Sequence, residues 1–184
     1  MRKVVLFKIG NQSYGVDLFH SRGIEDLVNI MQIPDAPAIM QGVVNIRGDL
    51  IPVFNLRKKF CLPEVAVSAN TKLIIGKMQG MTVAYLVDTV LGISELPDDA
   101  FTPPPVMVKS NETNYIEAII ESKAGLSILL HQEGIIEKAE MEKIMKILTD
   151  MKKEKEEEEA RKREEEMLRK LEEKRKKEEQ DEQP

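Results

Sequence analysis

Residues 42–60 constrain the fold most, because they have the pattern of a β-hairpin. Two apolar runs, residues 43–46 and 50–54, flank the polar tripeptide Arg47-Gly48-Asp49. A polar break between two apolar runs is typical of a tight turn, where Gly48 can take the positive φ that the turn requires. The sequence therefore predicts two antiparallel strands here, with Arg47 at the turn between them.

Short apolar runs separated by turn residues recur along the first 136 positions. They predict about ten strands, including residues 4–9, 13–18, 43–46, 50–54, 72–77, 82–88, 90–95, 115–121 and 125–131. This spacing favours β-barrels or a sandwich over βαβ units. Gly92 predicts a bulge, and Pro52, which donates no backbone hydrogen bond, predicts a strand edge or a bulge. Residues 38–41 predict one short helical turn.

The hairpin stretch resembles the signature of the CheW family of bacterial chemotaxis coupling adaptors, roughly G-V-x-N-L-R-G-x-I-x-P-V-x-D-L-R. The matching residues are Gly42, Val43, Asn45, Arg47, Gly48, Pro52, Val53, Leu56 and Arg57, with Ile46 for Leu and Asn55 for Asp. Residues 14–17, Tyr-Gly-Val-Asp, are similar to a pattern near the start of that family. The resemblance covers residues 4–136. It implies a mainly β fold of two small five-stranded SH3-like β-barrel subdomains packed together, followed by a C-terminal helix.

The resemblance also implies a function and a set of contacts. A CheW-like domain over residues 1–136 would act as a non-enzymatic signal-transduction adaptor. Its expected partners are the regulatory domain of a CheA-like histidine kinase and the cytoplasmic tip of chemoreceptors. The residues expected to contact partners are Asn45, Arg47, Gly48, Ile24 and Glu25. For Arg47 two roles stay open, direct contact with a partner or an internal ion pair that shapes the turn.

The chain departs from the family pattern before the signature. The family's Val-x-Glu-Ile segment falls on residues 21–24, so Ser21 and Gly23 stand in place of its Val and Glu. Glu25 is the nearest acidic residue and is the expected neighbour of Arg47. The alternative function is a structural or tethering module, in which the barrels bind partners and a charged helix is a spacer.

Helical spacing replaces the strand pattern after residue 136. Met141, Ile144, Met145, Leu148 and Met151 recur at helical spacing, which predicts an amphipathic helix over residues 137–151 that docks on the barrels. Residues 152–184 form a highly charged tail with fourteen acidic and twelve basic side chains. Seven Glu residues precede a basic residue by four positions, which supports an isolated helix. A weak coiled coil and a disordered tail stay open as alternatives.

No motif for catalysis, cofactor binding or metal binding occurs in the sequence. His20 and His131 are far apart, and the metal-ligand spacings CxxC and HExxH are absent. Cys61 is the single cysteine, so an internal disulfide is impossible, and we expect its side chain to be a small buried hydrophobe. We therefore expect a protein that is not an enzyme and has no cofactor, metal or small-molecule substrate.

The charge and hydropathy of the chain limit which partners it can have. The net charge of −5 argues against nucleic acid as a partner. The apolar run near the start is too short for a signal peptide or a membrane span, so direct membrane insertion is not expected. A single cysteine also fits a reducing compartment. These features together predict a cytoplasmic location.

Overall fold

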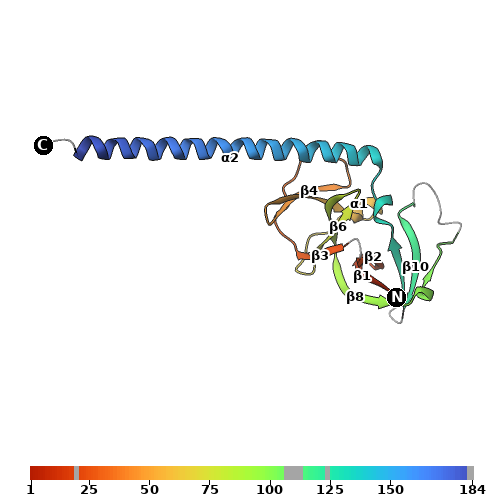
Figure 1. Cartoon of the computed structure of the whole chain (residues 1–184). Coiled ribbons are helices and arrows are strands. Elements are labelled where there is room, and N and C mark those ends of the chain that lie inside the picture. Colours follow the sequence, from red (N-terminus) through yellow and green to blue (C-terminus); the bar gives the residue numbers. More distant parts are fainter. Residues whose placement is uncertain (19–20, 106–113, 123–124, 182–184) are drawn as a thin grey trace. The chain divides into compact units, whose positions relative to one another are not determined.

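The computed structural model describes residues 1–18, 21–105, 114–122 and 125–181 (Figure 1). It is mainly β, with two sheets and a C-terminal helix, as predicted. By compactness the chain divides into two units, Met1–Ile144 and Met145–Pro184, and both sheets belong to the first. The predicted boundaries after residues 136 and 151 stay predictions.

The first sheet has six strands in the order β8-β1-β2-β11-β10-β9. They are β1 (Arg2–Ile9), β2 (Gln12–Asp17), β8 (Thr89–Leu96), β9 (Phe101–Thr102), β10 (Ile116–Ser122) and β11 (Gly125–Leu130). Its core consists of Val4, Leu6, Ala118, Ile120 and Leu129. Gly92 pairs with Leu6 while Val90 pairs with Phe7, so a bulge lies at the place that Gly92 predicted.

The second sheet has five strands in the order β3-β6-β7-β5-β4. They are β3 (Ser21–Asp26), β4 (Met40–Ile46), β5 (Asp49–Asn55), β6 (Lys72–Met78) and β7 (Met81–Val87). Its core consists of Val44, Ile51, Val53, Leu73, Ile75 and Ala84. Pro52 lies in β5, which is an interior strand, so of the two predicted alternatives the strand edge is wrong. A bulge does lie close by, because Gly42 pairs with Val53 and Met40 with Phe54. Because β5 pairs with β7 only over residues 53–55, Pro52 lies outside that ladder.

The two sheets exchange strands. β3 follows β2 in sequence but pairs with β6, and β8 follows β7 but pairs with β1. In the first sheet the hairpin β1-β2 pairs through β1 with the exchanged strand β8 and through β2, in parallel, with β11. In the second sheet the hairpin β6-β7 pairs through β6 with the exchanged strand β3 and through β7, in parallel, with β5. The first half of the chain, β1 to β5, therefore contributes a hairpin to the first sheet and three strands to the second. The second half contributes a hairpin to the second sheet and the strands β8, β10 and β11, besides the short β9, to the first.

Closure into barrels is not confirmed. Among the described residues, neither sheet's ladders return to their starting strand. An isolated bridge between Met31 and Val43 does connect the segment after β3 to edge strand β4. The first sheet has six strands instead of the expected five because Phe101–Thr102 adds β9.

Aromatic rings pack between the two sheets. Tyr14 of β2 stacks on Phe7 of β1, with ring centroids 5.9 Å apart, and on Phe60, 4.8 Å away. Phe60 follows α1 (Leu56–Lys59), the short helix that extends β5 of the second sheet. Phe60 also contacts Tyr115 at 5.3 Å. These stacked rings bury apolar area shared by both sheets.

A second connection between the sheets is ionic. Arg57 of α1 reaches Asp88, between β7 and β8, with Nε 3.0 Å from Oδ1 and Nη2 2.5 Å from Oδ2. Arg57 Nη1 donates to the Pro63 carbonyl at 2.8 Å. Asp88 Oδ2 also accepts from the backbone N–H of Gly10, in the β1–β2 turn, at 2.7 Å. The pair therefore joins a turn of the first sheet to a helix of the second.

Two local predictions differ from the structure. Residues 38–41 are not helical, because a single turn, closed by a Met40 N–H bond to Pro37 O of 2.8 Å, leads directly into β4. Cys61 is exposed, not buried. Its φ of 53° and its N–H bond to Lys58 O show that it ends α1, a position that follows the helix instead of packing beneath it.

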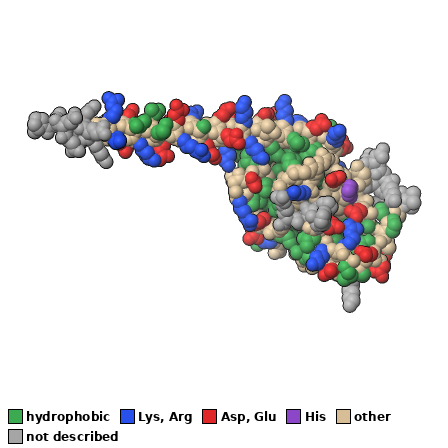
Figure 2. Space-filling view, viewed as in Figure 1, with side chains coloured by type: hydrophobic (Ala, Val, Ile, Leu, Met, Phe, Trp, Pro, Cys, Tyr) green, Lys and Arg blue, Asp and Glu red, His purple; other side chains and the backbone are tan. Residues whose placement is uncertain are grey.

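The C-terminal helix α2 spans Lys138–Asp181. Met141 and Ile144, which belong to the first unit, are buried. Figure 2 shows side chains of both charges mixed along the later turns. Three of the seven expected Glu-first ion pairs form, namely Glu158–Lys162, Glu159–Arg163 and Glu166–Lys170. Glu157 pairs with Lys153 and Arg169 with Glu173 instead, and the side chains of residues 176 and 177 lie outside the described part.

Candidate partner-binding surface

The turn between β4 and β5 has the geometry of a two-residue hairpin loop. Arg47 and Gly48 have φ values of 55° and 94°, as the type I′ turn between paired Ile46 and Asp49 requires. The Asn45 side chain accepts a hydrogen bond from the Gly48 N–H at 2.9 Å. The positive φ predicted for Gly48 is confirmed, and Asn45 has a role in shaping the turn.

Arg47 is an unusual residue for its place in this turn. Type I′ turns favour Asn, Asp or Gly at this position, because the left-handed conformation costs other L-residues about 1 kcal/mol. Its side chain is 85% exposed, so burial does not compensate for that strain. Neither the backbone conformation of the turn nor the packing of the core therefore requires an arginine at this position.

The Arg47 side chain forms an ion pair with Glu25. Nη2 lies 3.4 Å from Oε1, and the Glu25 side chain is 38% exposed. The internal pair left open by the sequence is therefore present, and Glu25 is the neighbour expected for Arg47. Such exposed pairs contribute about 0–1 kcal/mol to stability, so the pair orients Arg47 more than it stabilises the fold.

Ile24 lies on the opposite face of β3 from Glu25. Side chains alternate along a strand, and Ile24 pairs across the ladder with Ile74 whereas Glu25 pairs with Leu73. The structure thus brings together Asn45, Arg47, Gly48 and Glu25, which we call the Arg47 surface, but not Ile24. Ile24 is exposed on the other face of the same edge strand.

Sequence reasoning missed the segment between β3 and β4. Val28 and Met31 are exposed apolar side chains there, and Met31 exchanges two backbone hydrogen bonds with Val43, at 2.9 and 2.8 Å. A Cβ atom on Gly42 would lie 2.2 Å from the Met31 carbonyl oxygen. Gly42 in the signature is the signal that could have predicted this close approach of two backbones.

A second exposed surface lies on the first sheet. Leu91, at the bulge beside Gly92, and Ile93 of edge strand β8 are both at least half exposed. At the end of β8, Leu96 and Pro97 line a groove of about 800 Å³ that Leu6 of β1 also lines. We call Leu91, Ile93 and this groove together the β8 surface. Its alternating Leu-x-Ile pattern was visible in the sequence but indicates a buried face as readily as an exposed one.

The described residues contain no cluster of three His, Cys, Asp or Glu side chains that could hold a metal ion. His131 is exposed next to the 3₁₀ helix η5 (Gln132–Gly134), and His20 lies outside the described residues. Within the same described ranges, no helix is long and apolar enough to cross a membrane.

Comparison with known proteins gives a consistent result. Residues 3–140 match the family model of the CheW-like domain. The chemotaxis protein CheW of Treponema pallidum is 22% identical over 149 residues, covering 79% of this chain and 88% of that protein. The chemotaxis protein CheW of Klebsiella aerogenes is 26% identical over 140 residues, covering 76% and 84%. The crystal structure of the scaffolding protein TtCheW from Thermoanaerobacter tengcongensis superposes with a TM-score of 0.69 at 28% identity, covering 74% and 92%.

Proposed function

This chain belongs to the CheW-like family, and on that premise we propose that it is a non-enzymatic adaptor of chemotaxis signalling in the cytoplasm. It couples a CheA-like histidine kinase to the cytoplasmic tips of chemoreceptors through protein–protein contacts. The observation that carries the proposal is the presence of two exposed surfaces, the Arg47 surface and the β8 surface, on two different sheets of one unit. An adaptor needs two such surfaces because it must contact two partners at once.

The Arg47 surface is the proposed polar contact. Arg47 occupies a strained turn position, is held by Glu25 and projects into solvent. A charge at an exposed rim mainly steers and orients association, which suits an adaptor that selects its partners. Exposed Val28 and Met31, in the segment between β3 and β4, add apolar area beside the same sheet. Exposed Ile24 adds more, although it lies on the other face of β3.

The β8 surface is the proposed apolar contact. It combines a free sheet edge with exposed Leu91 and Ile93, and exposed apolar groups beside a groove are typical of protein-binding sites. We also propose that each sheet acts as an SH3-like barrel module. In the second sheet the Arg47–Glu25 pair and the Met31–Val43 bridge both span from one edge region to the other, as a curled sheet would require.

The test is a charge reversal at Arg47. Arg47→Glu should lower the affinity for a CheA-like regulatory domain or a receptor tip at least tenfold, which is about 1.4 kcal/mol, measured by calorimetry. Folding stability should change by less than about 1 kcal/mol, because the pair is exposed. Lys143→Glu, an exposed charge reversal on α2, is the matched control and should leave both affinities unchanged.

The double variant Arg47→Glu with Glu25→Arg separates contact from internal pairing. It restores an ion pair of opposite polarity, so it should regain stability but not binding. Parental affinity of Arg47→Glu for both partners would show that the Arg47 surface is not the contact.

The tethering function remains the second candidate because of α2. Its 44 residues correspond to a helix of about 66 Å, long enough for a spacer. Co-elution with a CheA-like regulatory domain separates the two functions, because a tether with unrelated partners would not bind that domain.

A further inference from the structure

The later turns of α2 carry one group of apolar side chains. Met167, Leu168 and Leu171 lie close together on the helix and are 60%, 54% and 53% exposed. Every other side chain from residue 152 to residue 175 is charged, except Ala160. Apolar side chains that gather in one place on a charged surface indicate an interaction site.

This group is not a continuation of the buried face of the helix. Leu148 belongs to the same unit, is buried, and lies 20 residues before Leu168. At 3.6 residues per turn, Leu168 and Leu171 point about 160° and about 140° away from Leu148 around the helix axis. The two leucines therefore form a second apolar face, which the described part of the chain leaves exposed.

Two charged residues extend this second face. Glu164 lies four positions before Leu168, and Arg175 lies four positions after Leu171. Steps of four, three and four residues place all four side chains on one seam of the helix, at the core positions of a coiled-coil heptad. Because each charge has a leucine four positions away on this side, the seam holds no i,i+4 ion pair of its own.

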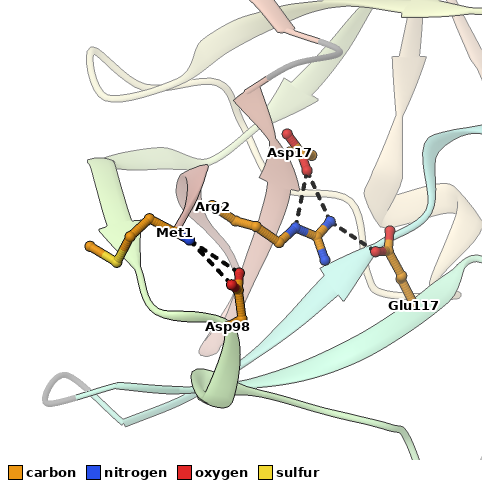
Figure 3. Close-up of polar contacts among 5 residues, drawn as sticks. All are labelled: Met1, Arg2, Asp17, Asp98 and Glu117. Carbon is orange, nitrogen blue, oxygen red and sulfur yellow. Dashed lines mark hydrogen bonds and ion pairs between the residues drawn. The ribbon is translucent and has the colours of Figure 1, made fainter.

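The charged group around Arg2 in the first unit shows the difference. Arg2 Nη2 lies 2.9 Å from both Asp17 Oδ2 and Glu117 Oε1, and Figure 3 shows the guanidinium between the two carboxylates. Those charges are compensated within the chain. Glu164 and Arg175 form no ion pair among the side chains that the structure describes, so a second chain can compensate them.

The order of the charges along the seam points to the partner. If two copies of α2 pair in the same direction, Glu164 lies opposite Glu164 and Arg175 opposite Arg175. If they pair in opposite directions with Leu168 opposite Leu171, Glu164 of each copy lies opposite Arg175 of the other. We propose that α2 binds α2 of a second copy of this chain as a short antiparallel coiled coil, with the leucines at its centre and a Glu164–Arg175 pair on each side.

The proposed pairing is weak and reversible. Two leucine pairs, with Met167 beside them, bury far less than the roughly 1,200 Å² of a stable interface. The pairing therefore brings two CheW-like units together only where the protein is concentrated. It uses neither the Arg47 surface nor the β8 surface, so it does not rest on the adaptor function, and either proposal can fail without the other.

Sedimentation equilibrium of the full chain tests the site. The average mass of the parent should rise towards that of a dimer between about 10 µM and about 1 mM, as expected of a small interface. Leu168→Gln with Leu171→Gln should weaken the dimer at least about tenfold, because it removes the apolar contacts. Met145→Gln replaces an exposed apolar side chain of the same helix outside the seam, and this matched control should dimerise like the parent.

Charge exchange tests the direction. Glu164→Arg and Arg175→Glu should each weaken the dimer at least about threefold, because two attractions become two repulsions. The double variant Glu164→Arg with Arg175→Glu should regain the parental affinity. In a parallel dimer like charges face each other in the parent and in all three variants, so all four affinities would be equal.

Three results would overturn the proposal. They are a parent that stays monomeric at about 1 mM, a double glutamine variant that dimerises as well as the parent, and equal affinities of the parent and the charge variants. Gln, Arg and Glu are good helix formers, so circular dichroism should show the parental helix content in every variant. If the glutamine variant loses helix, the charge variants decide.

Discussion

Replacing Arg57 by methionine tests whether the ionic connection between the sheets stabilises the fold. The Arg57 side chain is 13% exposed and that of Asp88 is 28% exposed, so the variant leaves a largely shielded carboxylate without its main partner. Hydrogen bonds to charged groups contribute about 1.5–3 kcal/mol, and breaking a fully buried pair costs about 3–5 kcal/mol. Because water still reaches Asp88, we expect a loss of about 2–3 kcal/mol in the free energy of unfolding.

Arg47→Met is the matched control, because it removes an arginine from an ion pair that is exposed. It should cost less than about 1 kcal/mol. Urea unfolding of both full-length variants can be followed by tyrosine fluorescence, since the chain has three tyrosines and no tryptophan. The slope of the unfolding free energy against urea concentration should be the same in the variants and the parent, so that a shift in midpoint reports a change in stability. If Arg57→Met costs no more than Arg47→Met, the connection does not stabilise the fold.

The loss should also depend on pH. Burial raises the pKa of Asp88, but hydrogen bonds from Arg57 and from the Gly10 N–H lower it more, so the folded-state pKa is lowered overall. A carboxyl with a lowered pKa adds stability above its unfolded value of about 3.9 and loses it as pH falls through the folded value. The gap between the parent and Arg57→Met should therefore narrow below about pH 4. A gap that is constant from pH 7 to pH 2.5 would contradict this argument.

Two further predictions concern Gly42 and the tail. In urea unfolding, Gly42→Ala should lower the free energy of unfolding by about 2–3 kcal/mol, because its Cβ would lie 2.2 Å from Met31 O. Gly80→Ala also has a positive φ but no atom within 4 Å, so it should lower that free energy by only about 1 kcal/mol. Equal losses in the two variants would mean that backbone strain, not the close approach to Met31, determines the cost. A chain ending after Met151 should keep its thermal midpoint within a few degrees, because solvated ion pairs contribute little. The separate 152–184 peptide should be helical by circular dichroism and lose helicity in high salt. A large fall in midpoint on truncation would refute this view of the tail.

The sequence predicted the features that a local pattern or the family resemblance indicates. The hairpin at residues 42–60 was predicted because apolar runs around a glycine turn leave few alternatives. The Arg47–Glu25 pair was anticipated because the family pattern, counted from Tyr14, places an acid near β3, and Glu25 was the nearest one. The bulge at Gly92 followed from a glycine within an apolar strand.

Features that depend on distant parts of the chain could not be predicted. Strand exchange leaves no local signal, because β3 and β8 have the same pattern whichever sheet they join. The interior place of β5, which made the edge prediction for Pro52 wrong, depends on pairing with β7. Cys61 is exposed because its backbone ends a helix of only four residues, which no periodicity reveals. Gln132 lies in a polar stretch, and such a stretch predicts exposure rather than a buried amide.

The exchange of β3 and β8 has a mechanical consequence. No single cut in the chain separates the two sheets, because a fragment ending before β6 holds one hairpin of the first sheet and three strands of the second. A pull on either sheet is transmitted through the crossing segments to the ladders of the other. Two proteins attached to different sheets would therefore be linked through two crossing segments and through the Arg57–Asp88 pair, which limit how far their mutual angle can change.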